Sequence, residues 1–176
     1  MMMASMARVS DASEAFGPVA LEAAYREHYR SLVRLASLLV DDVGTCEEIV
    51  QEAFVQVWRR GPALRSDDRL PAYLRSAVLN GARSHLRHRV VTRRHLPARP
   101  EPTEGPGASG LPGDAERVLR SLRALPHRQR EVLALRYYLD LSEAEIAATL
   151  GISAGSVKTH AHRGLATLAV RLEDLR

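Results

Sequence analysis

The sequence predicts an all-α protein of two small helical domains joined by a flexible linker, and three observations support this fold class. Apolar residues recur at three- and four-residue spacing over most of the chain, and no stretch shows the alternation of a β-strand. Residues 97–113 are rich in proline and glycine and have no hydrophobic period. Near the C-terminus, two amphipathic helices meet at a glycine, which is typical of a helix-turn-helix.

These patterns divide the 176 residues into four parts. We expect a disordered N-terminal tail at 1–18, a first domain at 19–96, a linker at 97–113 and a second domain at 114–176. As a flexible coil, the linker would span about 20–25 Å. Each domain is so small that its core is thin. We therefore expect a larger partner to hold the two domains at the separation at which they work.

Composition and motifs narrow the classes of function that this protein could have. The chain has 25 Lys and Arg against 21 Asp and Glu, a net charge of +4, which is weak evidence for a nucleic-acid partner. The single cysteine, Cys46, excludes an internal disulfide framework and a cysteine-based zinc site, and we expect it in the core. No glycine-rich phosphate loop or nucleophile–base arrangement is present. His85 and His88 come nearest to a metal pair, and no carboxylate neighbours them in sequence. We expect no catalysis, metal or cofactor.

The N-terminal residues contain no apolar run long enough for a signal peptide or a membrane span. We therefore expect no membrane association and a cytoplasmic location. Four methionines, at positions 1, 2, 3 and 6, leave the translation start open.

The first domain begins with a helix from Pro18 to Val40, since proline suits the first turn of a helix. Asp41, Asp42 and Gly44 should end it, and a second helix is expected from about Thr45. The second helix has a broad apolar face that includes Phe54 and Trp58. Its other face is acidic and amide-rich: Glu47, Glu48, Gln51, Glu52 and Gln56.

Gly61 and Pro62 should end the second helix, and Pro71 opens a third after a polar loop. Six residues of this helix can face inward: Leu70, Tyr73, Leu74, Ala77, Val78 and Leu86. Its outer side carries Arg75, Asn80, Arg83, Ser84, Arg87 and Arg89. Between Arg83 and Arg99 there are six arginines and no acid, a pattern that fits either an anionic partner or a solvated helix end.

In the second domain, one helix should run from Ala115 to Leu125 and another should start at Pro126. Four residues of the latter are expected to pack under the helix-turn-helix: Val132, Leu133, Leu135 and Tyr137.

The helix-turn-helix lies between Leu141 and Leu172. Ser142 is the expected N-cap of its first helix, Glu145 stands at the capping-box position, and Gly151 supplies a left-handed C-cap. The second helix should begin at Ser153. Its spacing predicts one buried stripe: Val157, Ala161, Leu165, Leu168 and Leu172.

The opposite face of this second helix is free to bind a partner. It carries hydroxyls and positive charge near the helix start: Ser153, Ser156, Lys158, Thr159, His160, His162 and Arg163. A helix-turn-helix places the first residues of its second helix in the major groove of DNA. Two packed helices of any α-domain with a solvated basic face remain the alternative at this point.

Three blocks in this order give a resemblance to a known family. CEEIVQEAFVQVW (46–58), LPAYLRSAVLNGARSHLRHR (70–89) and the C-terminal block from Leu125 to Leu168 resemble the extracytoplasmic function (ECF) class of bacterial RNA polymerase sigma factors. The resemblance covers the chain from Tyr25 to Leu172.

The resemblance implies three binding faces. The acidic second helix would dock on the clamp helices of the largest subunit of core RNA polymerase through Glu48, Gln51, Glu52 and Gln56. The third helix and the loop before it, from Arg60 to Arg69, would bind the −10 promoter element as a single strand, through Arg69, Tyr73, Asn80, Arg83 and Arg87. The recognition helix, 153–163, would bind the −35 element as duplex DNA.

Some positions depart from the family pattern. Many members carry arginine at the position of His160, an acid at that of Ser84 and tryptophan at that of Tyr73. The base preference therefore cannot be copied from relatives. The sequence also leaves open whether an anti-sigma protein sequesters the two domains. A free-standing dimeric helix-turn-helix regulator is the alternative function, and it leaves the first domain unexplained.

Overall fold

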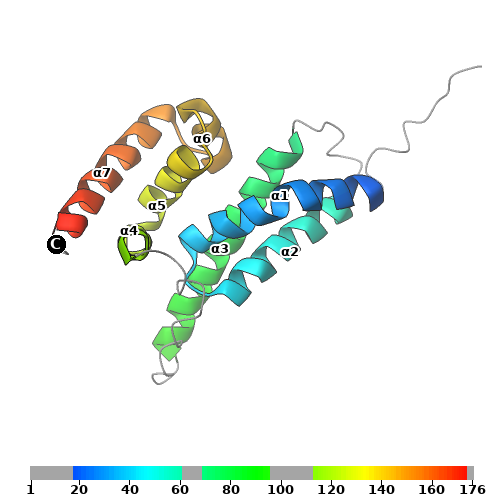
Figure 1. The fold of residues 1–176 in the computed structure, drawn as a ribbon, viewed down its shortest axis with the longest axis horizontal. Coiled ribbons are helices and arrows are strands. Elements are labelled where there is room, and N and C mark those ends of the chain that lie inside the picture. The colour runs from blue at the N-terminus through cyan, green and yellow to red at the C-terminus, as the bar shows by residue number, and fades with distance from the viewer. Residues whose placement is uncertain (1–17, 61–68, 96–112, 174–176) are drawn as a thin grey trace, which may run out of the picture.

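The computed structural model describes residues 18–60, 69–95 and 113–173, and within these ranges all regular structure is helical. The helices are α1 (Pro18–Leu39), α2 (Val43–Arg60), α3 (Leu70–His95), α4 (Gly113–Arg123), α5 (His127–Leu133), the π-helix η3 (Ala134–Tyr138), α6 (Glu143–Leu150) and α7 (Ala154–Glu173). Figure 1 shows α1 to α3 as one group and α4 to α7 as a second group beside it. We call these groups the first and second helical units. The all-α prediction is confirmed.

In the first unit, α1 packs against both α2 and α3, and these two helices also pack against each other. The centre of this unit is fully buried and aliphatic, with Leu35, Val50, Leu74 and Val78 at 0% exposure. Cys46 is 1% exposed in the same core, as predicted. Burial raises the pKa of its thiol to about 11.

Helix α2 begins two residues before the predicted Thr45. The Asp42 carboxylate accepts a hydrogen bond from the backbone N–H of Thr45 at 2.7 Å, so Asp42 caps the helix and Gly44 lies in its first turn. Hydrogen bonding from the side chain of Thr45, together with this bond from its backbone, lowers the pKa of Asp42 below its usual value. A side-chain cap therefore outweighs the helix-breaking tendency of the glycine.

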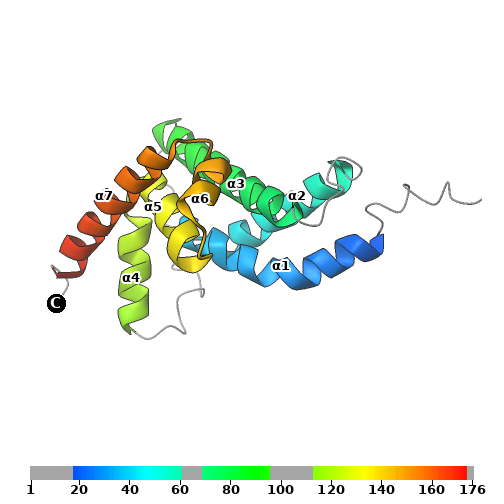
Figure 2. The ribbon, with the colours of Figure 1, turned by 90° about the horizontal axis from the view of Figure 1, so that it is seen from above.

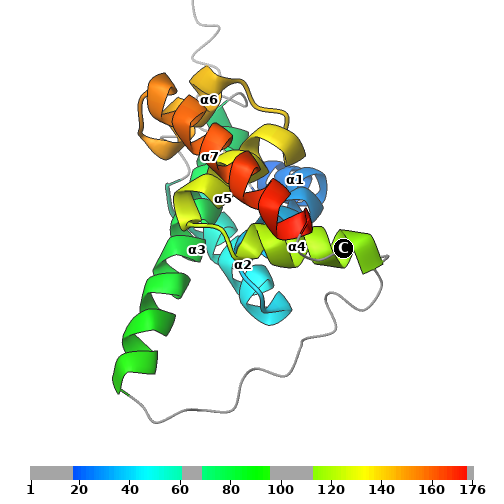
Figure 3. The same ribbon diagram turned by 90° about the vertical axis from the view of Figure 1, so that its left-hand side faces the viewer.

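Helix α3 is the longest helix that the structure describes, at 26 residues. Its first half is packed in the first unit, and its second half extends away from the rest of the molecule (Figure 3). Val90 and Val91 on this extension are 53% and 55% exposed. The helix around Val90 and Val91 therefore stands clear of the core.

In the second unit, the π-helix η3 changes which tyrosine is buried. The hydrogen bonds of a π-helix span five residues, one more than those of an α-helix, so a π-turn rotates the residues that follow it around the helix axis. Tyr137, which we expected to pack under the helix-turn-helix, is 62% exposed, and that expectation is wrong. Tyr138 packs against the core in its place.

The two helical units lie in contact. Helix α1 packs against α4, α5 and η3, and α3 packs against α6; Figure 2 shows α4 to α6 beside α1 and α3. We expected a larger partner to hold the two domains at the separation at which they work, and the linker composition gives no indication of this contact. The predicted tail (1–18), most of the loop between Arg60 and Arg69 and the linker (97–113) fall almost wholly outside the described residues.

Over 18–60, 69–95 and 113–173, no helix is both long and apolar enough to cross a membrane.

Candidate nucleic-acid interface

The turn of the helix-turn-helix forms as the sequence predicts. The Ser142 side chain accepts a hydrogen bond from the Glu145 backbone N–H, and the Glu145 carboxylate accepts one from the Ser142 backbone N–H at 2.9 Å, which completes the capping box. Gly151 ends α6 with a φ of 64° and a ψ of 40°, in the left-handed region. The capping box fixes the start of α6 and Gly151 fixes its end, and together they set the direction in which the chain enters α7.

Helix α7 begins at Ala154, directly after its N-cap residue Ser153. The Ser153 hydroxyl accepts a hydrogen bond from the backbone N–H of Ser156 at 3.1 Å and lies 2.9 Å from the Ser156 hydroxyl. Both serines that we assigned to DNA contacts therefore stand at the helix start. Ser153 serves as the N-cap of α7 through its hydroxyl, and the residue Ser156 is half-buried.

The predicted buried stripe of α7 is fully buried only in its first half, since Leu168 and Leu172 are half-buried. Val157 and Ala161 are buried as expected, whereas Leu165 is 42% exposed and that part of the prediction is wrong. Gly164 takes the buried position because α5 crosses α7 there. A Cβ on Gly164 would lie 3.0 Å from a methyl carbon of Leu133.

The face opposite this stripe is open to solvent. Lys158, Thr159, His162 and Arg163 are exposed, and His160 is half-buried. The Lys158 ammonium lies 3.6 Å from the carboxylate of Glu143 on α6, an exposed pair whose energy is small. Positive charge is thus presented at the N-terminal half of the helix that a helix-turn-helix inserts into the major groove.

The predicted DNA-melting residues follow one another along α3 and the turn before it. Arg69, Asn80 and Arg87 are exposed and Tyr73 is half-buried. Arg83 donates a hydrogen bond to Asn80 Oδ1 at 3.0 Å, so these two side chains form one polar group.

Three arginines that we expected on the outer side of α3 are partly buried. Arg89 pairs with Asp41 of the first unit at 3.3 Å, and the other two lie against the second unit. Arg83 forms a bidentate ion pair with Glu131 of α5 in the second unit. Arg75 is half-buried beside α6, and loss of hydration lowers the pKa of its guanidinium. The contact between the units, which periodicity within one helix does not encode, explains the burial of Arg83 and Arg75.

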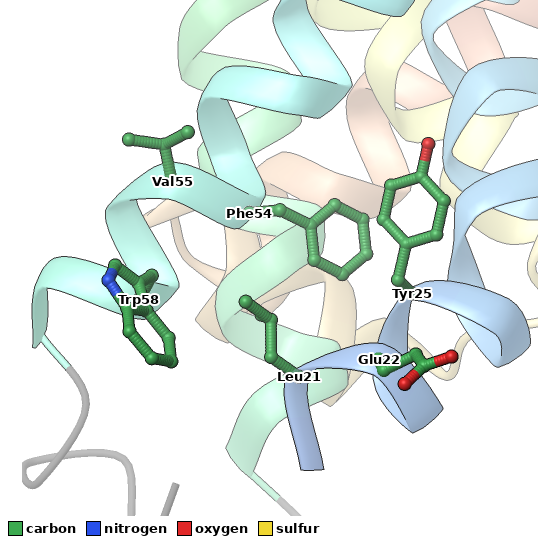
Figure 4. Close-up of a pocket in the computed structure, with 6 residues that line it drawn as sticks. All are labelled: Leu21, Glu22, Tyr25, Phe54, Val55 and Trp58. Atoms are coloured by element: carbon green, nitrogen blue, oxygen red, sulfur yellow. The ribbon is translucent and has the colours of Figure 1, made fainter. Parts of the chain in front are cut away.

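The third face is formed by α1 and α2. Glu48, Gln51 and Glu52 are exposed on α2, and Gln56 is half-buried with its amide 3.4 Å from the Glu52 carboxylate. Beside them lies an open apolar groove of about 610 Å³. Figure 4 shows Leu21 and Tyr25 of α1 facing Phe54 and Trp58 of α2 across this groove.

The sequence reasoning missed the contribution of α1 to this groove. Tyr25 of α1 is 39% exposed and stacks on Tyr29 with ring centroids 4.5 Å apart. Trp58 is 48% exposed. A tryptophan at the end of an otherwise buried stripe was the available signal for a binding groove.

Within the described residues, no group of three or more His, Cys, Asp or Glu side chains is arranged to hold a metal ion. Of the two histidines closest to a metal pair, His85 has a lowered pKa. Burial is the main cause, and the positive charge of Arg89 adds to it.

Comparison with known proteins agrees with this arrangement. Residues 24–91 match the family described as Sigma-70 region 2, and residues 115–168 match Sigma-70, region 4. The fold and the exposed helix-turn-helix thus define a DNA-binding protein of transcription initiation in the sigma-70 class.

Comparison with individual relatives narrows the assignment within the sigma-70 class. The chain is 31% identical over 176 residues to the ECF RNA polymerase sigma factor SigL of Mycobacterium tuberculosis, covering 97% of this chain and 98% of SigL. It is 32% identical over 149 residues to the RNA polymerase sigma-E factor of Streptomyces coelicolor, covering 84% of this chain and 82% of that protein. The chain belongs to the ECF family of RNA polymerase sigma factors. It directs promoter-specific initiation of transcription.

Two solved structures share the fold. CnrH in complex with the cytosolic domain of CnrY has a TM-score of 0.67 at 24% identity, covering 93% of this chain and 95% of that chain. The sigma factor RpoE in complex with the anti-sigma factor NepR from Bartonella quintana has a TM-score of 0.70 at 20% identity, with 88% and 98% covered.

Proposed function

We propose that the three faces of this sigma factor divide the work of initiation among named residues. The face of α1 and α2 binds core RNA polymerase, the face of α3 holds the −10 element as a single strand, and the exposed face of α7 binds the −35 element as duplex DNA. The protein acts in the cytoplasm, forms or breaks no covalent bond and needs no metal or cofactor.

Core polymerase binds to the groove and its acidic border. The groove offers apolar surface around Phe54 and Trp58, and exposed Glu48, Gln51 and Glu52 lie beside it on the same helix. A buried aromatic anchor beside carboxylates and amides suits a partner helix that carries both apolar and arginine side chains. The clamp helices of the largest polymerase subunit are the partner that the family resemblance implies.

Promoter melting follows from preferential binding of the unpaired strand. Tyr73 supplies an aromatic ring, Asn80 an amide, and Arg83 and Arg87 positive charge along one helix. Extruding a base costs a few kcal/mol, and stacking with cationic contacts to the backbone offsets this cost. The equilibrium shifts toward the melted DNA because the protein binds that state more tightly.

The recognition helix supplies contacts to duplex DNA. Arg163 is assigned to a guanine edge or a phosphate and Lys158 to a phosphate, because both side chains are long, exposed and on the face opposite the buried stripe. Ser153, Ser156, Thr159, His160 and His162 complete this surface. An anti-sigma protein, the class of partner in the Bartonella quintana complex, would act by covering these faces.

The observation that carries the proposal is the presence of both sigma-70 regions in one chain, with an exposed basic face on α7. The test is transcription from fragmented genomic DNA of the source organism by its core polymerase, with mapping of the 5′ ends. We expect new start sites that share two upstream elements and that need both core and this protein. Tight, core-independent binding of a dimer to a palindrome would contradict the proposal and favour the free-standing regulator.

A further inference from the structure

Three charged side chains from three different elements meet at the start of the helix-turn-helix. Glu143 is the first residue of α6, directly after the N-cap Ser142. Its Oε1 accepts a hydrogen bond from Arg136 Nη1 of η3 at 3.3 Å, and its Oε2 lies 3.6 Å from Lys158 Nζ of α7. Each oxygen of the carboxylate therefore faces one cation, and the carboxylate links η3 to the recognition helix.

The two cations are held with different firmness. The side chains of Arg136 and Glu143 are 38% and 31% exposed, whereas that of Lys158 is 69% exposed. The Arg136 guanidinium also lies 6.0 Å from the centroid of the Tyr137 ring, at the upper distance for a cation–π contact. The first turn of a helix favours negative charge, which fixes the carboxylate further. Arg136 thus anchors Glu143, and Glu143 restrains the flexible side chain of Lys158.

Stability alone does not account for the pair of Glu143 and Lys158. An exposed ion pair adds little to the free energy of folding. For DNA binding, the carboxylate is unfavourable, because Lys158 lies on the exposed face of α7 that we assign to duplex DNA. Phosphates repel the carboxylate and compete with it for the ammonium group. A residue selected for DNA affinity alone would not be acidic here.

This competition has different results in specific and non-specific complexes. When base contacts seat α7 in the major groove, they fix one phosphate beside Lys158, and an ammonium that is already oriented loses little freedom on binding it. In a non-specific complex no base contact fixes the helix, so loose contacts between cations and phosphates supply the affinity. Glu143 weakens those loose contacts. Since specificity is a difference between two affinities, it rises when the non-specific affinity falls.

We propose that Glu143 is a specificity-determining residue of the DNA-binding face, which orients Lys158 for one phosphate of the −35 duplex and weakens its contacts with other DNA. This inference deepens the proposed function and rests on the assignment of α7 to duplex DNA.

The test is binding of the polymerase holoenzyme to two short duplexes, one with the −35 element of a mapped promoter and one with that element scrambled. Fluorescence anisotropy gives the dissociation constants over a range of salt concentrations, and core polymerase without this protein gives the baseline. Glu143→Gln is compared with the matched control Glu116→Gln, which removes an acid that pairs with an arginine within α4 at 3.9 Å. The capping box of Ser142 and Glu145 is intact in both variants, and circular dichroism checks the fold.

We expect Glu143→Gln to bind the scrambled duplex several-fold more tightly, with a salt slope that is steeper by about one because Lys158 gains a phosphate contact. Binding to the promoter duplex should not become tighter, so the ratio of the two dissociation constants should fall several-fold. This effect should disappear when Lys158→Gln is added, because Glu143 acts through Lys158. If Glu143→Gln does not fold, Arg136→Gln decides, since loss of the anchor must also lower the ratio.

A ratio and a salt slope equal to those of Glu116→Gln would overturn the proposal, and so would an effect that persists without Lys158. A general loss of structure would weaken binding to both duplexes and would not steepen the slope. If the wild-type holoenzyme distinguishes the duplexes and Glu143→Gln does so equally well, the role of Glu143 is refuted and the proposed function stands. If the wild-type holoenzyme binds both duplexes equally, the assignment of α7 to the −35 element fails, and this inference fails with it.

Discussion

Gly81 of α3 lies directly against Ile49 of α2. A Cβ placed on Gly81 would come within 2.8 Å of Ile49 Cγ2 and within 3.6 Å of Ile49 Cβ. Such an approach is shorter than real Cβ contacts, and the nearest atoms belong to a β-branched side chain that has little rotamer freedom. The absence of a side chain at Gly81 therefore sets the distance between the helix that carries the acidic face and the helix that carries the melting face.

Gly81→Ala should lower the free energy of unfolding. Overpacking costs about 1–3 kcal/mol, whereas alanine gains up to about 1 kcal/mol over glycine in a helix. The net effect is a loss of about 1 kcal/mol, measured by urea denaturation. Adding Ile49→Ala should remove the clash, so the double variant should be more stable than the sum of the two single effects predicts. Simple additivity would contradict the close approach.

Gly155→Ala is the matched control for that experiment. Gly155 also lies in a helix, but the nearest atom to a Cβ there is the Ser153 hydroxyl oxygen at 3.9 Å. Without a clash, the gain in helix propensity should remain, and the variant should be as stable as the wild type or more stable by up to about 1 kcal/mol.

Gly151→Ala should destabilise the protein through backbone strain alone. Its φ of 64° is unfavourable for a residue with a Cβ, and no atom lies within 4 Å of the position that this Cβ would take. We expect a loss of about 1 kcal/mol for alanine and a smaller loss for Gly151→Asn, because asparagine tolerates the left-handed region. Equal losses for the two variants would show that the conformation at Gly151 is not the cause.

The parts of the fold that the sequence predicted correctly are those set by local chemistry. Pro18, the Ser142 capping box and Gly151 mark helix ends because each acts on backbone groups within a few residues. The errors at Tyr137 and Leu165 have a different origin. The π-helix η3 rotates the chain so that Tyr138 packs against the core in place of Tyr137, and the crossing of α5 over α7 puts Gly164 in the buried position in place of Leu165. A regular hydrophobic period in the sequence reveals neither feature.

The contact between Arg83 and Glu131 could not be predicted for the same kind of reason. The two residues are 48 positions apart and lie in different units, and each on its own fits an exposed polar position. Periodicity assigned Arg83 to a solvent-facing surface, which is where it would lie if the units were separate. The roles assigned to individual site residues stay predictions.

The capping box should make stability depend on pH. Hydrogen bonds from the Ser142 side chain and backbone lower the pKa of the Glu145 carboxyl. A pKa that is lower in the folded state gives stability that is present above the unfolded pKa, near 4.5, and is lost as pH falls through the folded pKa. Glu145→Gln should therefore narrow the stability difference between pH 7 and pH 3, measured by urea denaturation. An unchanged difference would contradict the role of this carboxylate.

Cys46 should be unreactive in the folded protein. Its thiol is 1% exposed and its pKa is about 11, so the thiolate that attacks maleimides is scarce and inaccessible at pH 8. Labelling should be at least about a hundredfold slower in buffer than in concentrated urea, on the basis of an opening free energy of several kcal/mol. Rapid labelling of the native protein would show that the first unit opens readily.

Arg163→Ala should weaken binding of the polymerase holoenzyme to duplex −35 DNA. If Arg163 contacts a guanine, the loss should be about 1–3 kcal/mol and restricted to sequences that carry that base; if it contacts a phosphate, the loss should be uniform across sequences and should lower the salt slope by about one. Fluorescence anisotropy at two salt concentrations, with a matched and a single-base-changed duplex, distinguishes the two roles. Arg171→Ala is the control, because Arg171 is also exposed on α7 but lies in its last turn. Equal effects of the two substitutions would mean that net charge rather than the recognition face accounts for DNA binding, and no effect of either would remove Arg163 from the interface.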